Sequence, residues 1–149
     1  MKVRELLEKK GRPVVTIRSD KTVDDAVGLM AAEKASALIV LEKDHPVGIF
    51  AERDVLRAYL KNKSIAFAEI KLADAMTNKL IQAGPEDKVV AATQMMLKAD
   101  IRHLPVIDDD RIIGMLTISD LVEHRLDALD AELRHLKDYI ADLHDAGHD

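Results

Sequence analysis

Two segments of the chain place an aspartate six residues after a glycine: Gly48 with Asp54, and Gly114 with Asp120. In both, two apolar residues follow the glycine, as at the end of a strand, and the aspartate falls in the first turn of an expected helix. The start of a helix offers unpaired N–H groups and a positive dipole end, which suit a phosphate group. The carboxylate can accept hydrogen bonds from two neighbouring ribose hydroxyls, and the glycine leaves room for a flat base. These residue types predict ligand binding at both positions.

The residue that opens the second helix has two interpretations. Thr117 can donate its hydroxyl to a phosphate group. Thr117 and Asp120 also match a capping box, in which a threonine and an acid three residues later satisfy N–H groups of the first helical turn. Ala51 stands at the corresponding place in the first segment and has no side chain that can cap, yet an aspartate recurs at Asp54. Reciprocal capping alone does not explain both aspartates, so ligand binding and capping both stay open.

The two segments belong to an internal repeat. When the sequence is shifted by 66 residues, residues 20–60 lie over residues 86–126 without a gap. Upstream, residues 3–7 resemble residues 72–76 at a different offset, so the first copy carries extra residues near Lys9–Gly11.

Each copy has the same expected order of elements. A short strand comes first, and a helix follows whose apolar residues recur at helical spacing, with Thr22 as N-cap in the first copy. A strand pair with a tight turn comes next, and a last helix begins near Glu52 or Ile118. The segment 61–71 links the copies and is expected to be partly helical around 66–70. The expected strands are 14–17, 37–41 and 47–50 in the first copy, and 80–83, 103–107 and 112–116 in the second.

Composition excludes several classes of protein. The chain has 149 residues, of which 48% are hydrophobic but only 3% aromatic, so we expect an ordered fold with an aliphatic core. A net charge of −5 argues against binding nucleic acid or an anionic membrane. The chain has no cysteine, and its start shows no signal-peptide core and no apolar run that could span a membrane. A cytoplasmic protein is the expectation.

Taken together, the tandem copies, the glycine-to-aspartate pattern and the segment Arg102–Val106 resemble a pair of cystathionine-β-synthase (CBS) domains, also called a Bateman module. The resemblance covers about residues 3–126. It implies an α/β fold of two pseudo-two-fold related β-α-β-β-α repeats packed sheet to sheet. It also implies two clefts that bind adenosyl ligands such as AMP, ATP or S-adenosylmethionine.

The resemblance assigns roles residue by residue. The motif aspartates would hold ribose, the motif threonine or serine would contact phosphate, and basic residues before the Leu-Pro-Val strand would reach phosphate. Backbone of the first strand of each repeat would lie beside the base. Ala51 and Glu52 depart from the pattern and should weaken phosphate binding in the Asp54 cleft, although Arg53 compensates, so the Asp120 cleft is the preferred site. The candidate ligand-binding residues are Asp120, Thr117, Ser119, Gly114, Arg102, His103, Ile81, Asp54, Arg53, Gly48 and Thr16.

The C-terminal segment carries a second pattern. Apolar residues recur at alternating spacings of four and three from Val122 to Leu143, as in a coiled-coil seam of about three heptads. We expect this helix to mediate a homodimer; the alternative is that its seam folds onto its own domain. His144 and His148 stand four apart, but no firm third ligand accompanies them, so no metal site is assigned.

These observations divide the chain into repeat 1 (1–62), a linker (63–71), repeat 2 (72–126) and an amphipathic C-terminal helix extension (127–149). No catalytic set of residues emerges, so we expect no enzyme and no required cofactor. The favoured hypothesis is a regulatory module that senses an adenine nucleotide or S-adenosylmethionine and acts on an unknown partner in trans. The alternative is a dimeric interaction protein with vestigial clefts, and a nucleotide hydrolase or transferase is the weakest hypothesis.

Overall fold

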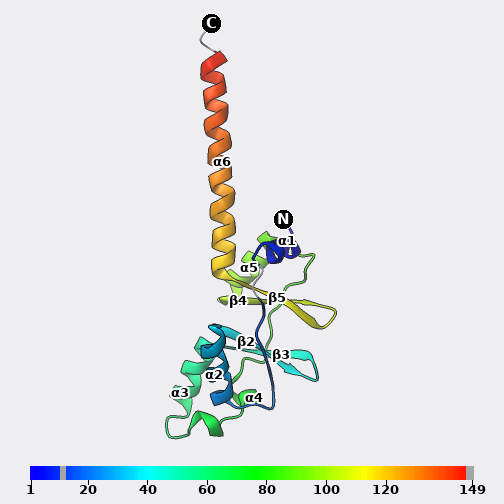
Figure 1. The fold of residues 1–149 in the computed structure, drawn as a ribbon, viewed down its shortest axis with the longest axis vertical. Helices are drawn as coiled ribbons and strands as arrows, with labels where there is room; N and C mark the ends of the chain where they lie inside the picture. Colours follow the sequence, from blue (N-terminus) through cyan, green and yellow to red (C-terminus); the bar gives the residue numbers. More distant parts are fainter. Residues whose placement is uncertain (11–12, 147–149) are drawn as a thin grey trace.

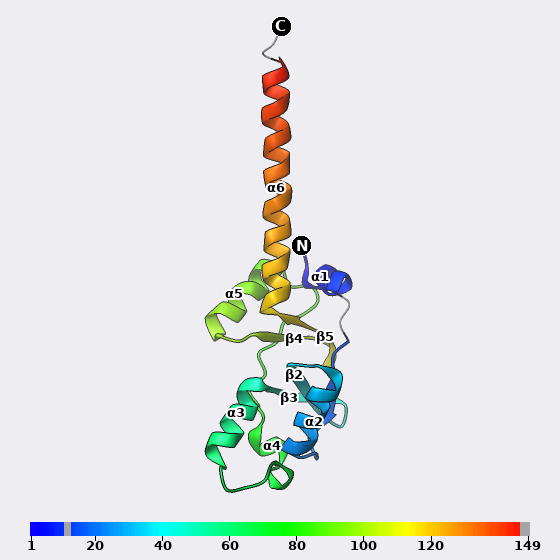
Figure 2. The ribbon, with the colours of Figure 1, turned by 60° about the vertical axis from the view of Figure 1, so that its left-hand side comes forward.

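The chain forms a two-part body from which one long helix projects (Figure 1). This computed structural model describes residues 1–10 and 13–146. The two parts of the body lie one above the other along the long axis of the molecule, and α6 (Ile118–Ala146) continues that axis outward (Figure 2). Each part has its own core; both cores are mostly aliphatic, as the low aromatic content predicts, and Phe50 is buried in the core of the first repeat.

The first repeat has the expected order of elements. A three-stranded sheet runs β1-β2-β3, with β1 parallel to β2 and β2 antiparallel to β3. Helix α2 begins after Thr22, whose hydroxyl accepts from the Asp25 N–H while the Asp25 carboxylate accepts from the Thr22 N–H. The predicted N-cap is therefore confirmed. The elements are β1 Thr16–Arg18, α2 Val23–Glu33, β2 Ala37–Glu42, β3 His45–Ala51 and α3 Glu52–Lys61.

The hairpins of the two repeats turn in the same way. Lys43 and Asp44 in the first, and Asp109 and Asp110 in the second, have positive φ angles of 50° to 66°. Two consecutive residues in this conformation make the tight turn whose twist matches that of antiparallel strands. The first turn is therefore confined to residues 43–44, and His45 and Pro46 belong to β3.

The second repeat differs from the prediction at its first strand. It contains α5 (Val89–Ala99), β4 (His103–Asp108) and β5 (Arg111–Thr117), but β4 and β5 form a two-stranded sheet. The predicted strand 80–83 is reduced to a single parallel bridge from Ala83 to Val106.

Pro105 accounts for this loss. In the first repeat the Ile39 N–H donates to the Val15 carbonyl at 3.1 Å and joins β1 to β2. The repeat places Pro105 over Ile39, and proline has no N–H to donate. Only the bonds on either side of Val106 remain, from Ala83 N–H to Pro105 O and from Ile107 N–H to Ala83 O, both at 2.9 Å.

The N-terminal segments of the two repeats are exchanged. Helix α1 (Val3–Lys10) packs on the second repeat, where Val3 and Leu6 are buried in its core. The 3₁₀ helix η1 (Phe67–Glu69), which lies in the predicted linker, and α4 (Leu72–Ala75) pack on the first repeat, where Leu72 is buried. The packing thus joins residues from different predicted segments. The division into 1–62, 63–71, 72–126 and 127–149 remains a proposal.

Candidate functional site

Asp120 lies buried at the start of α6, with only 1% of its surface exposed. Its Oδ2 accepts from the Thr117 N–H at 2.9 Å, and its own N–H donates to the Thr117 hydroxyl at 3.2 Å. This is the reciprocal cap that was one of the two interpretations of the motif. The Thr117 oxygen serves as the acceptor in this bond, so its hydroxyl proton can still be donated to another group.

Asp54 is also buried, at 3% exposure, but it is held differently. One carboxylate oxygen accepts from the Ala51 N–H at 2.8 Å, and the other accepts from the Thr77 hydroxyl at 2.8 Å. The Arg57 guanidinium stands 3.5 Å from the second oxygen. Thr77 arrives from the segment that follows α4, so a residue of the exchanged segment stabilises the aspartate where Ala51 cannot cap.

The two motif glycines are explained by close packing. A Cβ at Gly48 would stand 2.7 Å from Met76 Sδ and 2.9 Å from the Thr77 carbonyl oxygen. A Cβ at Gly114 would stand 2.7 Å from Leu7 Cδ2. The exchanged segments therefore occupy the space beside both glycines, which the sequence had suggested for a base.

The N-termini of α3 and α6 approach each other where the repeats meet. His103 pairs with Thr117 across β4 and β5, and its Nε2 lies 2.7 Å from the Ser36 hydroxyl of the first repeat. Arg53 donates to the Asp100 carbonyl at 3.3 Å across the same boundary. Burial lowers the pKa of His103, against the opposing charge of Glu52. A polar cluster of both repeats therefore surrounds the half-buried imidazole.

The remaining predicted residues are spread over the body. Arg102 is exposed, and its carbonyl accepts from the Ile118 N–H at 3.0 Å. Ser119 is exposed in the first turn of α6, and Ile81 packs against the second core.

Thr16 lies on β1 beside a hollow of about 430 Å³, which Arg18 and Lys21 also line. A second hollow of about 460 Å³ includes Arg57 and Lys61, and neither hollow is lined by Asp54 or Asp120.

Three residues near the site were missed in the sequence. Thr77 donates to Asp54, Ser36 contacts His103, and Lys10 forms an ion pair with Glu123, one turn after Asp120. The same ion pair raises the pKa of Lys10. The match between segments 3–7 and 72–76 indicated that the α1 and α4 regions are equivalent. It did not indicate that each region packs on the other repeat.

The described residues, 1–10 and 13–146, contain neither a metal-binding cluster nor a membrane-spanning helix. No group of three histidine, aspartate or glutamate side chains there is arranged to hold a metal ion. His148, one of the two spaced histidines, lies outside these residues. None of the helices described is both long and apolar enough to cross a membrane.

Known proteins share this architecture. The CBS domain family model matches residues 3–61 and 72–127. A mitochondrial CBS domain-containing protein of Arabidopsis thaliana is 40% identical over 127 residues, which are 82% of this chain and 61% of that protein's length. A CBS-domain-containing protein from Agrobacterium tumefaciens is 30% identical with a TM-score of 0.77, covering 84% of this chain and 99% of that one.

Two more distant structures share the fold and contain ligands. A CBS domain protein of Pyrobaculum aerophilum complexed with AMP has a TM-score of 0.71 at 23% identity, covering 80% of this chain and 89% of that one. The CBS domain pair of the protein MJ0100, in complex with 5′-methylthioadenosine and S-adenosylmethionine, has a TM-score of 0.72 at 24% identity, covering 83% and 94%. The repeat, the α/β fold of two facing repeats and the family match over both halves lead to one conclusion: this chain belongs to the CBS domain family.

Proposed function

We propose that this protein is a regulatory module that binds an adenosyl ligand in the cleft beside Asp120. The observation that carries the proposal is the buried Asp120 carboxylate at the start of α6, next to a threonine that retains a donor proton. A carboxylate in this position suits a ribose diol, and the helix start with Thr117 suits a phosphate. The structural relatives with AMP and with S-adenosylmethionine support an adenosyl ligand.

Two differences between the repeats favour the Asp120 cleft. In the Asp54 cleft, Ala51 offers no hydroxyl to a phosphate, and Glu52 places a negative charge at the helix start. In the Asp120 cleft, residue 105 is a proline, so it donates no ladder bond to the Ile81 carbonyl. That carbonyl is a suitable acceptor for the amino group of an adenine.

The regulatory output is proposed to act on a partner protein in trans, without catalysis by this chain and without a required cofactor. We also propose that the chain is a homodimer through its long C-terminal helix, located in the cytoplasm, with no role in binding nucleic acid. A conformational response to ligand requires that the ligand bind one state more tightly than another.

Thermal unfolding with AMP, ADP, ATP, S-adenosylmethionine and NADH tests this function. A ligand at a hundred times its dissociation constant should add about 2.7 kcal/mol of stability. The Asp120→Asn variant should lose this shift, and each variant is compared with its own ligand-free baseline because Asp120 also caps α6. Asp54→Asn is the matched control in the other cleft and should retain the shift.

Either negative result has a definite meaning. No shift with any of the five ligands would reject the sensor and favour the dimeric interaction protein with vestigial clefts. Loss of the shift only in Asp54→Asn would move the site to the first repeat.

A further inference from the structure

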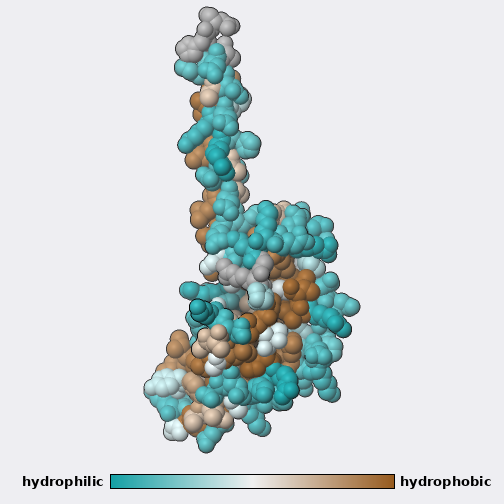
Figure 3. Space-filling model, viewed as in Figure 1, coloured by the Kyte–Doolittle hydropathy of each residue, from teal (hydrophilic) through white to brown (hydrophobic). Residues whose placement is uncertain are grey.

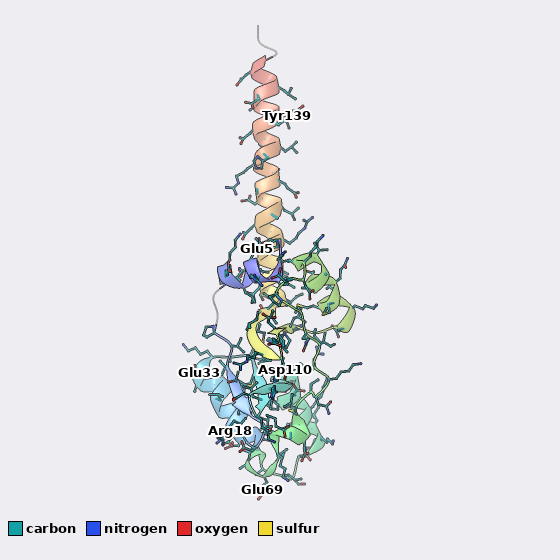
Figure 4. The ribbon with its side chains drawn as sticks, turned by 90° about the vertical axis from the view of Figure 1, so that its right-hand side faces the viewer. Glu5, Arg18, Glu33, Glu69, Asp110 and Tyr139 are labelled. Atoms are coloured by element: carbon teal, nitrogen blue, oxygen red, sulfur yellow. The ribbon has the colours of Figure 1, made fainter. Side chains whose placement is uncertain are left out.

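An apolar stripe runs along α6, the helix that leaves the body. Figure 3 shows hydrophobic residues along one side of the projecting helix. Figure 4 shows the outer part of α6, where Tyr139 is labelled, with its side chains projecting away from the helix axis and no other element beside them. The stripe consists of Val122, Leu126, Leu129, Leu133, Leu136, Ile140 and Leu143, which are 42% to 59% exposed. The alternative that this seam folds onto its own domain is therefore wrong.

The stripe has the spacing of a two-stranded coiled coil. Leu126, Leu133 and Ile140 stand seven residues apart and take position a of the heptad. Val122, Leu129, Leu136 and Leu143 then take position d. Such a row of half-exposed aliphatic side chains is expected to be covered in solution by another apolar helix.

The charged residues beside the stripe indicate which helix covers it. With this register, Arg125 and Glu132 take position g, and Asp130 and Lys137 take position e. In a parallel pair, each g residue faces the e residue five positions later on the other helix. Arg125 then faces Asp130, and Glu132 faces Lys137, so both pairs carry opposite charges and both occur twice by symmetry.

From this pattern we infer that α6 is a parallel, in-register coiled coil with a second copy of this chain. The inference rests on the homodimer of the proposed function and adds its orientation and register. In an antiparallel pair, position g faces g and e faces e, so Arg125 would not meet Asp130 and Glu132 would not meet Lys137. The parallel pair places both CBS domain bodies at the same end of one stalk.

Single cysteines test the orientation, because the natural sequence contains none. In a parallel pair in register, every seam residue lies beside its own copy. Leu126→Cys and Leu143→Cys should therefore each crosslink to a covalent dimer with a short bis-maleimide. Asp138→Cys, at outward position f, is the matched control and should remain a 16.6 kDa monomer on a denaturing gel. In a centred antiparallel pair, each end residue would stand more than about 20 Å from its copy.

A charge exchange tests the register. Glu132→Lys should weaken the dimer roughly tenfold in sedimentation equilibrium, because two attractions become repulsions. Adding Lys137→Glu should restore it, since opposite charges again meet. Failure of both end cysteines to crosslink within a dimer, or failure of the double variant to recover, would overturn the parallel register. A monomer at all concentrations would reject the homodimer itself, whatever ligand the body binds.

Discussion

Gly114 lies under the Leu7 side chain, and its replacement has a predictable effect. An alanine Cβ there would stand 2.7 Å and 2.9 Å from the two Leu7 methyl carbons, so Leu7 must move. We expect Gly114→Ala to lower the free energy of unfolding by about 1–3 kcal/mol, as overpacked cores do. Urea denaturation measures the loss, and adding Leu7→Ala should recover part of it because the clash is removed.

Gly48 and Gly28 provide comparisons for the stability loss expected at Gly114. Gly48→Ala should cost more than Gly114→Ala, because the Thr77 carbonyl at 2.9 Å belongs to backbone that cannot easily move: the Thr77 carbonyl accepts from the Ile49 N–H, and the Thr77 N–H donates to the Ile49 carbonyl. Gly28 lies within α2 with nothing within 4 Å, so Gly28→Ala should stabilise the chain by up to about 1 kcal/mol. Equal losses at all three positions would contradict the packing explanation.

His103 makes the stability depend on pH. Burial lowers its pKa in the folded chain, so the unfolded chain binds a proton at this residue more readily. The stability linked to neutral His103 is present above the usual histidine pKa of about 6.5 and is lost as the pH falls toward the lower folded pKa.

A single substitution isolates this contribution from the other histidines. His103→Gln is expected to keep a hydrogen-bonding group near Ser36 and to remove the titration. The difference in unfolding free energy between the two proteins should therefore change between pH 8 and pH 5, with the wild type losing more stability at the acidic end. A difference that is constant across this range would argue against a buried neutral imidazole.

Among the helices, α3 and α6 begin at equivalent positions with different caps. Thr117 and Asp120 form both halves of a capping box, whereas Ala51 leaves only the half made by Asp54. Ala51→Thr should therefore stabilise the chain by roughly 1 kcal/mol, and Thr117→Ala should destabilise it by a similar amount. Urea denaturation of the two variants checks both signs, and a loss in Ala51→Thr would mean that Thr77 already fills the space for a hydroxyl.

Local patterns predicted most elements, and a single proline explains the main exception. The α2 cap depends on residues within one turn, Thr22 and Asp25, so the sequence contains all the information needed. The first strand of the second repeat depends on a partner some twenty residues away, and its apolar sequence Leu80–Ala83 gave no sign of the missing donor at Pro105. The equivalent positions of Asp54 and Asp120 in the first turns of α3 and α6 follow from the repeat, whereas their burial and the contact of Asp54 with Thr77 depend on segments whose positions the motif does not encode.

At the scale of the whole molecule, the two repeats are joined by exchange as well as by their facing sheets. Val3 and Leu6 fill the second core, and Ile70 and Leu72 fill the first. The Val3 and Arg4 N–H groups donate to the Asp87 and Pro85 carbonyls, which fixes α1 on the second repeat. Sequence order could not predict this exchange, because the apolar spacing of a short helix does not specify which of two similar cores it enters.

The exchange predicts which repeat each core substitution loosens. Leu6 and Leu72 are both buried, at 1% and 0% exposure, so either change to alanine should cost about 2–5 kcal/mol. Hydrogen exchange distinguishes them: Leu6→Ala should first reduce protection in α5, β4 and β5, although Leu6 belongs to the first repeat in sequence. Leu72→Ala should first reduce protection in α2 and α3. The exchange would be refuted if Leu6→Ala instead loosened the first repeat and Leu72→Ala the second, because α1 and α4 would then pack on their own halves in solution.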